Sequence, residues 1–124
     1  MDSNTLAGAV YSNSTPLRTP KALEFEAIAA STRKLKSAAQ MGKKGYVQLA
    51  NALYENRRLW TFLATQVADN ENDLPNELRA QIFYLAQFTQ VHSAKILEGK
   101  ARVRPLIEIN MALLRGLGEA GAGQ

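Results

Sequence analysis

Apolar residues recur along most of the chain at intervals of three and four positions, which is the period of an α-helix. The clearest case lies between residues 44 and 68, where one helical face would carry Tyr46, Leu49, Leu53, Asn56, Trp60, Leu63 and Val67. No segment alternates apolar and polar residues between turn-forming residues, as a half-buried strand would. The pattern therefore predicts an all-α protein.

The residues that start and stop helices divide this pattern into elements. Thr19 followed by Pro20 favours a helix start, and the glycines of MGKKG favour its end after about residue 40. Glycine or proline also bounds the other main helices, which we expect at about residues 44–68, 75–98 and 105–117. Short connections between amphipathic helices predict a small antiparallel bundle of four main helices.

The length of 124 residues fits a single domain with its own apolar core. Residues 1–18 are expected to form a short helix, at about residues 3–11, and a linker, while residues 118–124 have the composition of a flexible tail. The sequence has no cysteine, no signal-peptide pattern and no apolar run of about 20 residues. We therefore expect a cytoplasmic protein without membrane insertion.

Three polar residues interrupt the apolar stripes of three different helices, namely Asn56, His92 and Asn110. A buried amide left unpaired costs roughly 1–3 kcal/mol, so these side chains should bond to one another or to backbone carbonyls. We predict that they form a polar layer across the bundle. The layer either fixes the register of the helices or lines a polar groove for a partner, with Arg57 reaching a carboxylate.

The single tryptophan, Trp60, lies on the same stripe as Asn56 and directly follows the segment ENRRL. A lone tryptophan on such a stripe is usually a core residue. Tryptophan and arginine are also enriched in the energetically dominant parts of protein interfaces, so a half-exposed anchor is the alternative.

The net charge of +4 is unevenly distributed. No acidic residue lies between Ala27 and Tyr54, whereas acids gather in DNENDLPNE at residues 69–77. The stretch without acids contains a candidate nucleic-acid patch made of Arg33, Lys34, Lys36, Lys43 and Lys44. The alternative is that these side chains are solvated at a helix end, where lysines interact favourably with the helix dipole.

Residues suited to catalysis are scarce in this sequence. One histidine and no cysteine leave no tetrahedral metal set. There is also no glycine loop for phosphate and no nucleophile elbow. We expect no enzymatic activity, no metal, no cofactor and no small-molecule substrate.

Five segments in order, TPKALEFEAI, NRRLW, LPNELRAQIFYLAQF, HSAKILEG and LIEINMALLRGL, together resemble the FlaF family of flagellin-synthesis regulators, over about residues 5–117. The resemblance implies a small helical cytoplasmic protein that is needed for flagellin production and filament assembly. It also implies that such a protein binds flagellin as a secretion chaperone. A second regulator, FlbT, acts alongside the family on flagellin messenger RNA.

The positions that match the family motifs are Asn56, Arg57, Trp60, His92, Leu106, Ile107, Glu108, Ile109 and Asn110. Three of them form the predicted polar layer, so the motif identifies the family without locating a binding site. Arg57 and Glu108 are expected either to form an ion pair within that layer or to meet a partner. The candidate partner-binding residues are Arg57, Arg58, Trp60 and Glu108.

The leading hypothesis is flagellin binding through an apolar groove between helices, as chaperone and regulator. The alternative is contact with flagellin messenger RNA through the basic stretch, alone or with FlbT, with an affinity that falls steeply with salt. A docking module for FlbT is a third hypothesis and would use the same groove as the first.

Overall fold

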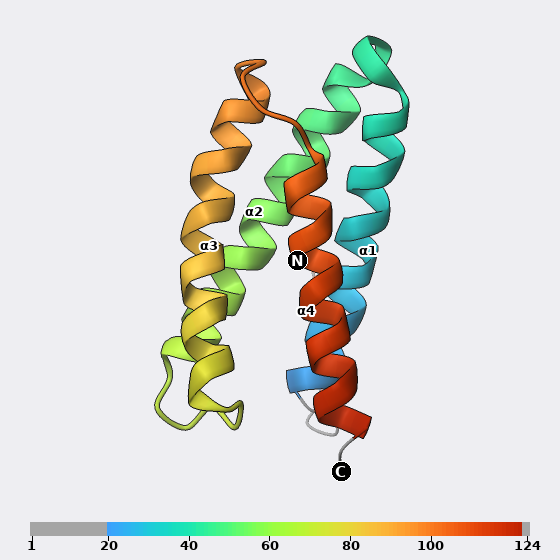
Figure 1. Cartoon of the computed structure of the whole chain (residues 1–124). Coiled ribbons are helices and arrows are strands. Elements are labelled where there is room, and N and C mark those ends of the chain that lie inside the picture. Colours follow the sequence, from blue (N-terminus) through green and yellow to red (C-terminus); the bar gives the residue numbers. More distant parts are fainter. Residues whose placement is uncertain (1–19, 123–124) are drawn as a thin grey trace, which may run out of the picture.

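A computed structural model describes residues 20–122 of the chain, with side chains described for residues 25–118. The helices alternate in direction (Figure 1), and their bounds are α1 Pro20–Gln40, α2 Tyr46–Ala68, α3 Asn76–Leu97 and α4 Arg104–Ala122. A short 3-10 turn, η2, joins α1 to α2 at Gly42–Gly45. The predicted all-α antiparallel bundle of four main helices is confirmed. The short helix and linker expected within residues 1–18 lie outside the described residues.

The last helix is longer than its sequence predicts. Residues 118–122, expected to belong to a flexible tail, continue α4 as far as Ala122. Leu117, the expected last residue, is buried in a cluster that includes Ile28 of α1. Packing of this residue therefore outweighs the low helix propensity of the nearby glycines.

The four helices occupy the corners of a bundle. α2 packs against α1 and α3, and α1 packs against α4, whereas α3 and α4 have little contact. α2 and α4 are thus diagonally opposite, with α4 in front of α2 in Figure 1. Among residues 20–122, no helix combines the length and the apolar character needed to cross a membrane.

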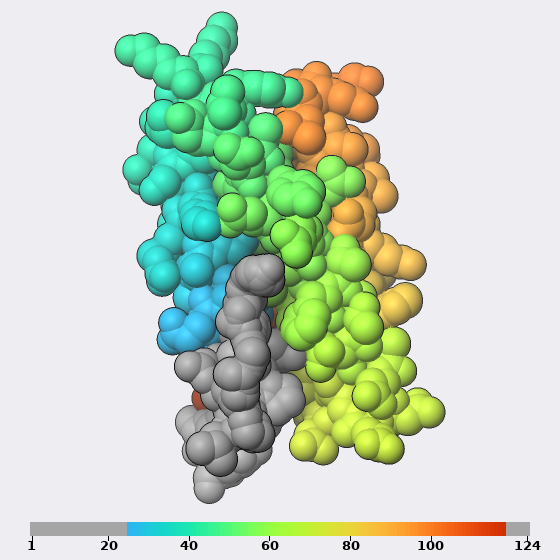
Figure 2. All heavy atoms as spheres, turned by 180° about the vertical axis from the view of Figure 1, so that it is seen from behind, coloured from blue at the N-terminus to red at the C-terminus, as the bar shows by residue number. Residues whose placement is uncertain are grey.

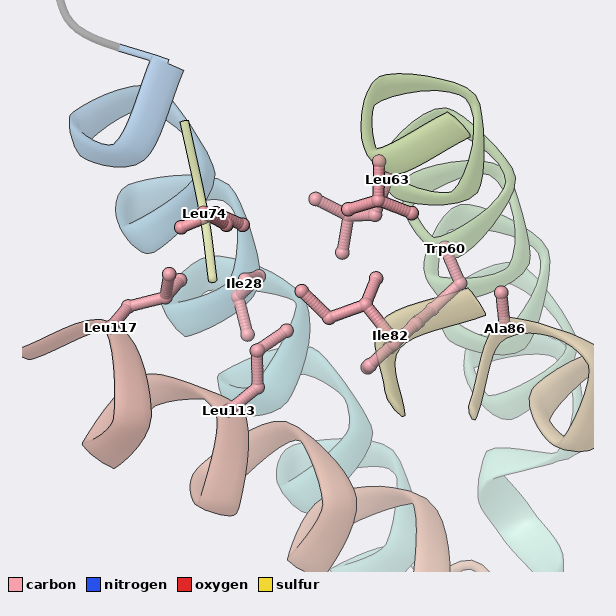
Figure 3. Packing of buried hydrophobic residues seen from close by; sticks show 9 residues of the cluster. Ile28, Trp60, Leu63, Leu74, Ile82, Ala86, Leu113 and Leu117 are labelled. Carbon is pink, nitrogen blue, oxygen red and sulfur yellow. The ribbon is translucent and has the colours of Figure 1, made fainter. Parts of the chain in front are cut away.

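Buried apolar side chains form two clusters. The lower cluster, seen in Figure 3, draws on all four helices and the α2–α3 loop and consists of Ile28, Trp60, Leu63, Val67, Leu74, Ile82, Ala86, Leu113 and Leu117. The upper cluster, nearer η2, consists of Leu35, Ala38, Ala52, Leu53, Ile96 and Leu106. Ser31, Asn56 and Asn110 are fully or almost fully buried and fall between the two sets on their own helices. A polar layer therefore divides the core.

The two ends of the bundle are closed by different means. At the end formed by the acidic α2–α3 connection, Arg79 of α3 donates Nε and Nη2 to the carbonyl of Val67, at 3.0 and 2.7 Å. Nη2 also donates to the carbonyl of Asp69 at 2.9 Å, so one guanidinium satisfies free carbonyls at the end of α2. At the other end, Gly99 follows α3 with φ of +77°, a conformation that glycine adopts without steric cost.

Candidate functional site

The polar layer joins three of the four helices through buried hydrogen bonds. Asn56 of α2 has no exposed surface. Its Oδ1 accepts hydrogen bonds from Ser31 Oγ and from Asn110 Nδ2, both at 2.9 Å. Trp60 Nε1 donates to Asn110 Oδ1, also at 2.9 Å. The structure therefore brings Asn56 and Asn110 together, and these bonds reach across the diagonal from α2 to α4.

Ser31 was missed in the analysis of the sequence, although a signal was present. It lies on α1 three residues after Ile28, four before Leu35 and seven before Ala38, all of which are buried. A serine on such a stripe needs a hydrogen-bonding partner inside the core, and that partner is Asn56.

His92 does not belong to the layer, so its predicted place there is wrong. The half-buried ring stacks on Phe88, with centroids 5.0 Å apart. Nε2 lies 2.9 Å from the carbonyl of Arg102 and donates to it. Thr89 and Ser93 occupy the fully buried positions of this part of α3 instead. Position 92 lies at the edge of the stripe, where its ring reaches the α3–α4 connection rather than the centre.

Thr89 and Ser93 differ from the other buried polar residues of the bundle. Each side chain has no exposed surface. Within the described part of the chain, neither hydroxyl has a hydrogen-bonding partner, and the same holds for Asn56 Nδ2. α3 is therefore the helix that contributes buried hydroxyls without being bonded to the layer.

Trp60 is a core residue and is not available to a partner. Its exposed fraction is 0%. Its indole N–H is satisfied by Asn110, and its ring packs in the lower cluster with Ile82 and Ala86 (Figure 3). Its place among the predicted partner-binding residues is therefore wrong, because the residue faces the core stripe that also carries Asn56.

Arg57 connects α2 to α3. Its side chain is half-buried, and Nε donates to Gln90 Oε1 at 3.1 Å. Gln90 Nε2 returns bonds to the Arg57 carbonyl at 3.2 Å and to Thr61 Oγ1 at 3.1 Å. Glu108 is exposed on α4, and among the described residues it forms no ion pair with Arg57. The expected Arg57–Glu108 pair is absent because α2 and α4 are diagonally opposite.

Arg58 is exposed, unlike its neighbour Arg57. Its guanidinium carbon lies 5.8 Å from the centroid of the Tyr54 ring, within the range of a cation–π interaction. Arg58 and Glu108 are thus the two predicted partner-binding residues in the exposed class, and they lie on different helices.

Large apolar side chains are exposed on the two helices that pack most extensively. We define the α2–α3 outer face as Val47, Tyr54, Phe62, Phe83, Tyr84 and Val91. Their exposed fractions range from 46% for Phe83 to 66% for Val47 and Tyr84. Figure 2 shows this side of the molecule, with α2 in green and α3 beside it in yellow to orange. The sequence analysis missed these residues because it followed the buried stripes.

These side chains are exposed at several levels along the two helices. Val47, Tyr54 and Phe62 recur at about two-turn intervals on α2, as Tyr84 and Val91 do on α3. Phe83 lies on the side of α3 that carries Arg79 and Gln90, both of which bond to α2. Phe83 therefore lies on the edge of α3 that is next to α2.

Three of the basic residues proposed as a nucleic-acid patch line two different pockets. Arg33 and Lys34 line a groove between α1 and α2, where Lys34 Nζ is 2.6 Å from Glu55 Oε1. Lys43 lines a different pocket beside η2. Lys36 and Lys44 are exposed and line neither. In the region that the structure describes, no three His, Cys, Asp or Glu side chains are grouped as a metal site requires.

The comparisons agree with the motifs. The family model of "Flagellar protein FlaF" matches residues 9–117. Comparisons with curated proteins and with solved structures found no match. The matched range contains each of the segments whose order and spacing resemble that family, and it covers most of the 124 residues. The chain therefore belongs to the FlaF family of flagellar proteins.

Proposed function

We propose that this flagellar protein is a non-enzymatic cytoplasmic chaperone that binds flagellin through the α2–α3 outer face and thereby regulates flagellin supply to the filament. Family membership supports the flagellar role. The flagellin partner is what the resemblance to the family implies. The observation that carries the proposal is the set of six large apolar side chains exposed on two adjacent helices.

The composition of this face suits a protein partner. Contiguous exposed apolar patches are uncommon on monomeric proteins and often mark interaction sites. Tyrosine, phenylalanine and arginine are enriched at interfaces, and here Arg58 lies over Tyr54 within the face. Two parallel rows of side chains on packed helices accept a third, amphipathic helix. Covering the apolar helices of unassembled flagellin would prevent their aggregation.

The proposal moves the expected site from a groove to an outer face. Trp60, which the sequence offered as an alternative anchor, is buried, whereas Tyr54, Arg58 and Phe62 on the same helix are exposed. The RNA alternative has less support, because Lys34 is paired with Glu55 and Arg33 and Lys43 line different surfaces. Docking of FlbT would use the same face as flagellin binding. The identity of the bound partner therefore distinguishes a docking module for FlbT from a flagellin chaperone.

Titration calorimetry of purified flagellin into the full chain tests the proposal. The test variant is Phe62→Ser with Tyr84→Ser, and the matched control is Phe25→Ser with Met111→Ser, which alters exposed apolar residues on α1 and α4. We expect the test variant to bind flagellin at least about tenfold more weakly with an unchanged melting temperature, since interface hot spots contribute about 2 kcal/mol or more. The control should bind like the unaltered protein.

Salt provides a second criterion. Apolar contact is screened little, so binding should persist at high ionic strength, unlike RNA contact. Absence of flagellin binding by the unaltered chain would refute the proposal. An equal loss in both double variants would refute the assignment to the outer face.

A further inference from the structure

A pocket of about 620 Å³ opens at the η2 end of the bundle. The end of α1, the start of α2 and the connection leading into α4 form its walls. We call it the basic pocket, and its lining consists of Ala38, Ala39, Gly42, Lys43, Tyr46, Leu49, Arg102, Val103 and Arg104. Neither the buried layer nor the α2–α3 outer face uses these residues, so the pocket needs its own explanation.

Three cationic residues line this concave surface, and its lining contains no acidic residue. In the described part of the chain, the ion pairs are Lys34–Glu55 and Lys100–Glu98, and neither includes Lys43, Arg102 or Arg104. The first turn of α4, which begins at Arg104, also carries no acidic residue to offset the positive end of its dipole. The positive charge of this lining therefore favours an anionic ligand.

The wall of the pocket is held in place by two side chains from other elements. His92 of α3 donates Nε2–H to the carbonyl of Arg102 at 2.9 Å and stacks on Phe88. Tyr46 donates its hydroxyl to the carbonyl of Leu97 at 3.4 Å. These bonds fix the α3–α4 connection before any ligand arrives, which lowers the entropic cost of binding. They also give His92 a positioning role.

We propose that the basic pocket binds an acidic peptide segment of a partner protein, with carboxylates on the cations and an aliphatic side chain on the apolar floor. The floor is aliphatic, formed by Leu49, Val103 and alanines. Single-stranded nucleic acid is bound on several aromatic rings along a basic track, whereas Tyr46 is the one aromatic residue in this lining. The proposal does not rest on flagellin binding, since it concerns a different surface and a different ligand chemistry.

Fluorescence anisotropy with end-labelled synthetic probes tests the proposal on the full chain. The main probe is a short amidated peptide of glutamate and leucine. The comparison probes are a lysine–leucine peptide, a glutamate-only peptide and poly(U) RNA. We expect the glutamate–leucine peptide to bind most tightly, the glutamate-only peptide more weakly, and the lysine–leucine peptide not at all.

Two charge-reversal variants locate the site. Arg102→Glu with Arg104→Glu should weaken binding of the main probe roughly tenfold or more, because two converging cations become repulsive. Arg33→Glu with Arg115→Glu makes the same change in net charge at exposed positions elsewhere and should change affinity little. Circular dichroism melting confirms folding. If the first variant unfolds, amide shifts of Lys43 and Val103 on titrating the unaltered protein decide instead.

Each remaining outcome overturns the proposal. Equal weakening in the two variants would mean that net charge alone attracts the peptide. Tighter binding of poly(U), in competition with the peptide, would assign the pocket to nucleic acid. No saturable peptide binding, or amide shifts confined to other surfaces, would leave the pocket without this ligand.

Discussion

The polar layer and the α2–α3 outer face both include residues from the same turns of α2. The residues of the layer point into the core, and those of the outer face point away from it. Asn56 and Trp60 face inward, are fully buried and are tied to Asn110 on the diagonally opposite helix. Tyr54 and Phe62 face outward and are more than half exposed. The family motif thus belongs mainly to the region that builds the fold. The surface available to a partner lies on neighbouring positions of the same helix.

This difference separates two kinds of effect that substitutions in α2 should have. A change in the layer should act on the free energy of unfolding, and on partner binding only through loss of folded protein. A change on the outer face should act on binding and leave stability nearly unchanged.

The largest effect is expected for Trp60→Ala. The substitution removes the largest buried side chain of the lower cluster and leaves Asn110 Oδ1 without its donor. We expect unfolding to become easier by about 3–5 kcal/mol, measured by urea denaturation. The control is Phe62→Ala, which removes an exposed ring two residues further along α2 and should cost little. A Trp60→Ala protein of normal stability would contradict the burial of this residue.

Asn56→Ala tests the layer itself. Ser31 Oγ and Asn110 Nδ2 both lose their acceptor, and each donor left unpaired in the core costs about 1–3 kcal/mol. The same measurement on Asn51→Ala, an exposed asparagine of α2, should change stability by less than about 0.5 kcal/mol. Equal effects of the two substitutions would mean that the layer contributes nothing specific.

Gly45→Ala tests whether the backbone of the η2 turn is packed as tightly as the buried side chains. A Cβ at this buried position would lie 2.5 Å from Cβ of Met41, so the η2 turn must shift. We expect a loss of about 1–3 kcal/mol in thermal unfolding. Gly116→Ala, on α4 where a Cβ meets nothing within 4 Å, should instead stabilise by about 0.5–1 kcal/mol. Stabilisation by both substitutions would argue against close packing at η2.

The smallest effect on stability is expected for Thr89→Val, on α3, the helix that is not bonded to the layer. The Thr89 hydroxyl is buried and, within the described residues, unpaired, so Thr89→Val should leave stability unchanged or raise it by up to about 1 kcal/mol. Denaturation curves of the two proteins measure this directly. A clear loss of stability would mean that the hydroxyl is hydrogen-bonded in solution and that α3 does join the layer.

The sequence predicted the helices and the inward side of α2 well, because both follow from spacing alone. Intervals of three and four residues identify the face that carries Asn56 and Trp60, and burial then requires their polar atoms to be paired. The same reasoning failed for His92, since a stripe defines a face but not its edge. A displacement of one residue, from Ser93 to His92, changes the neighbour from the core to the α3–α4 connection.

The outward surface was not predictable in the same way. Exposed residues such as Tyr84 and Val91 follow no packing rule, so their periodicity carries no signal of its own. The basic pocket was equally hidden, because Lys43 and Arg104 are far apart in sequence and line one pocket only when α1 and α4 pack together. Sites made by tertiary packing require the fold first.

The fluorescence emission of Trp60, recorded alone and during titration with purified flagellin, tests the central claim most directly. The single tryptophan is buried in the layer, so its emission should be blue-shifted and should stay at the same wavelength while calorimetry reports binding. That result would show that flagellin binds at a surface that does not include the motif residue Trp60. A red-shifted emission that moves to the blue as flagellin is added would contradict the account, because it would place Trp60 at the surface that flagellin covers.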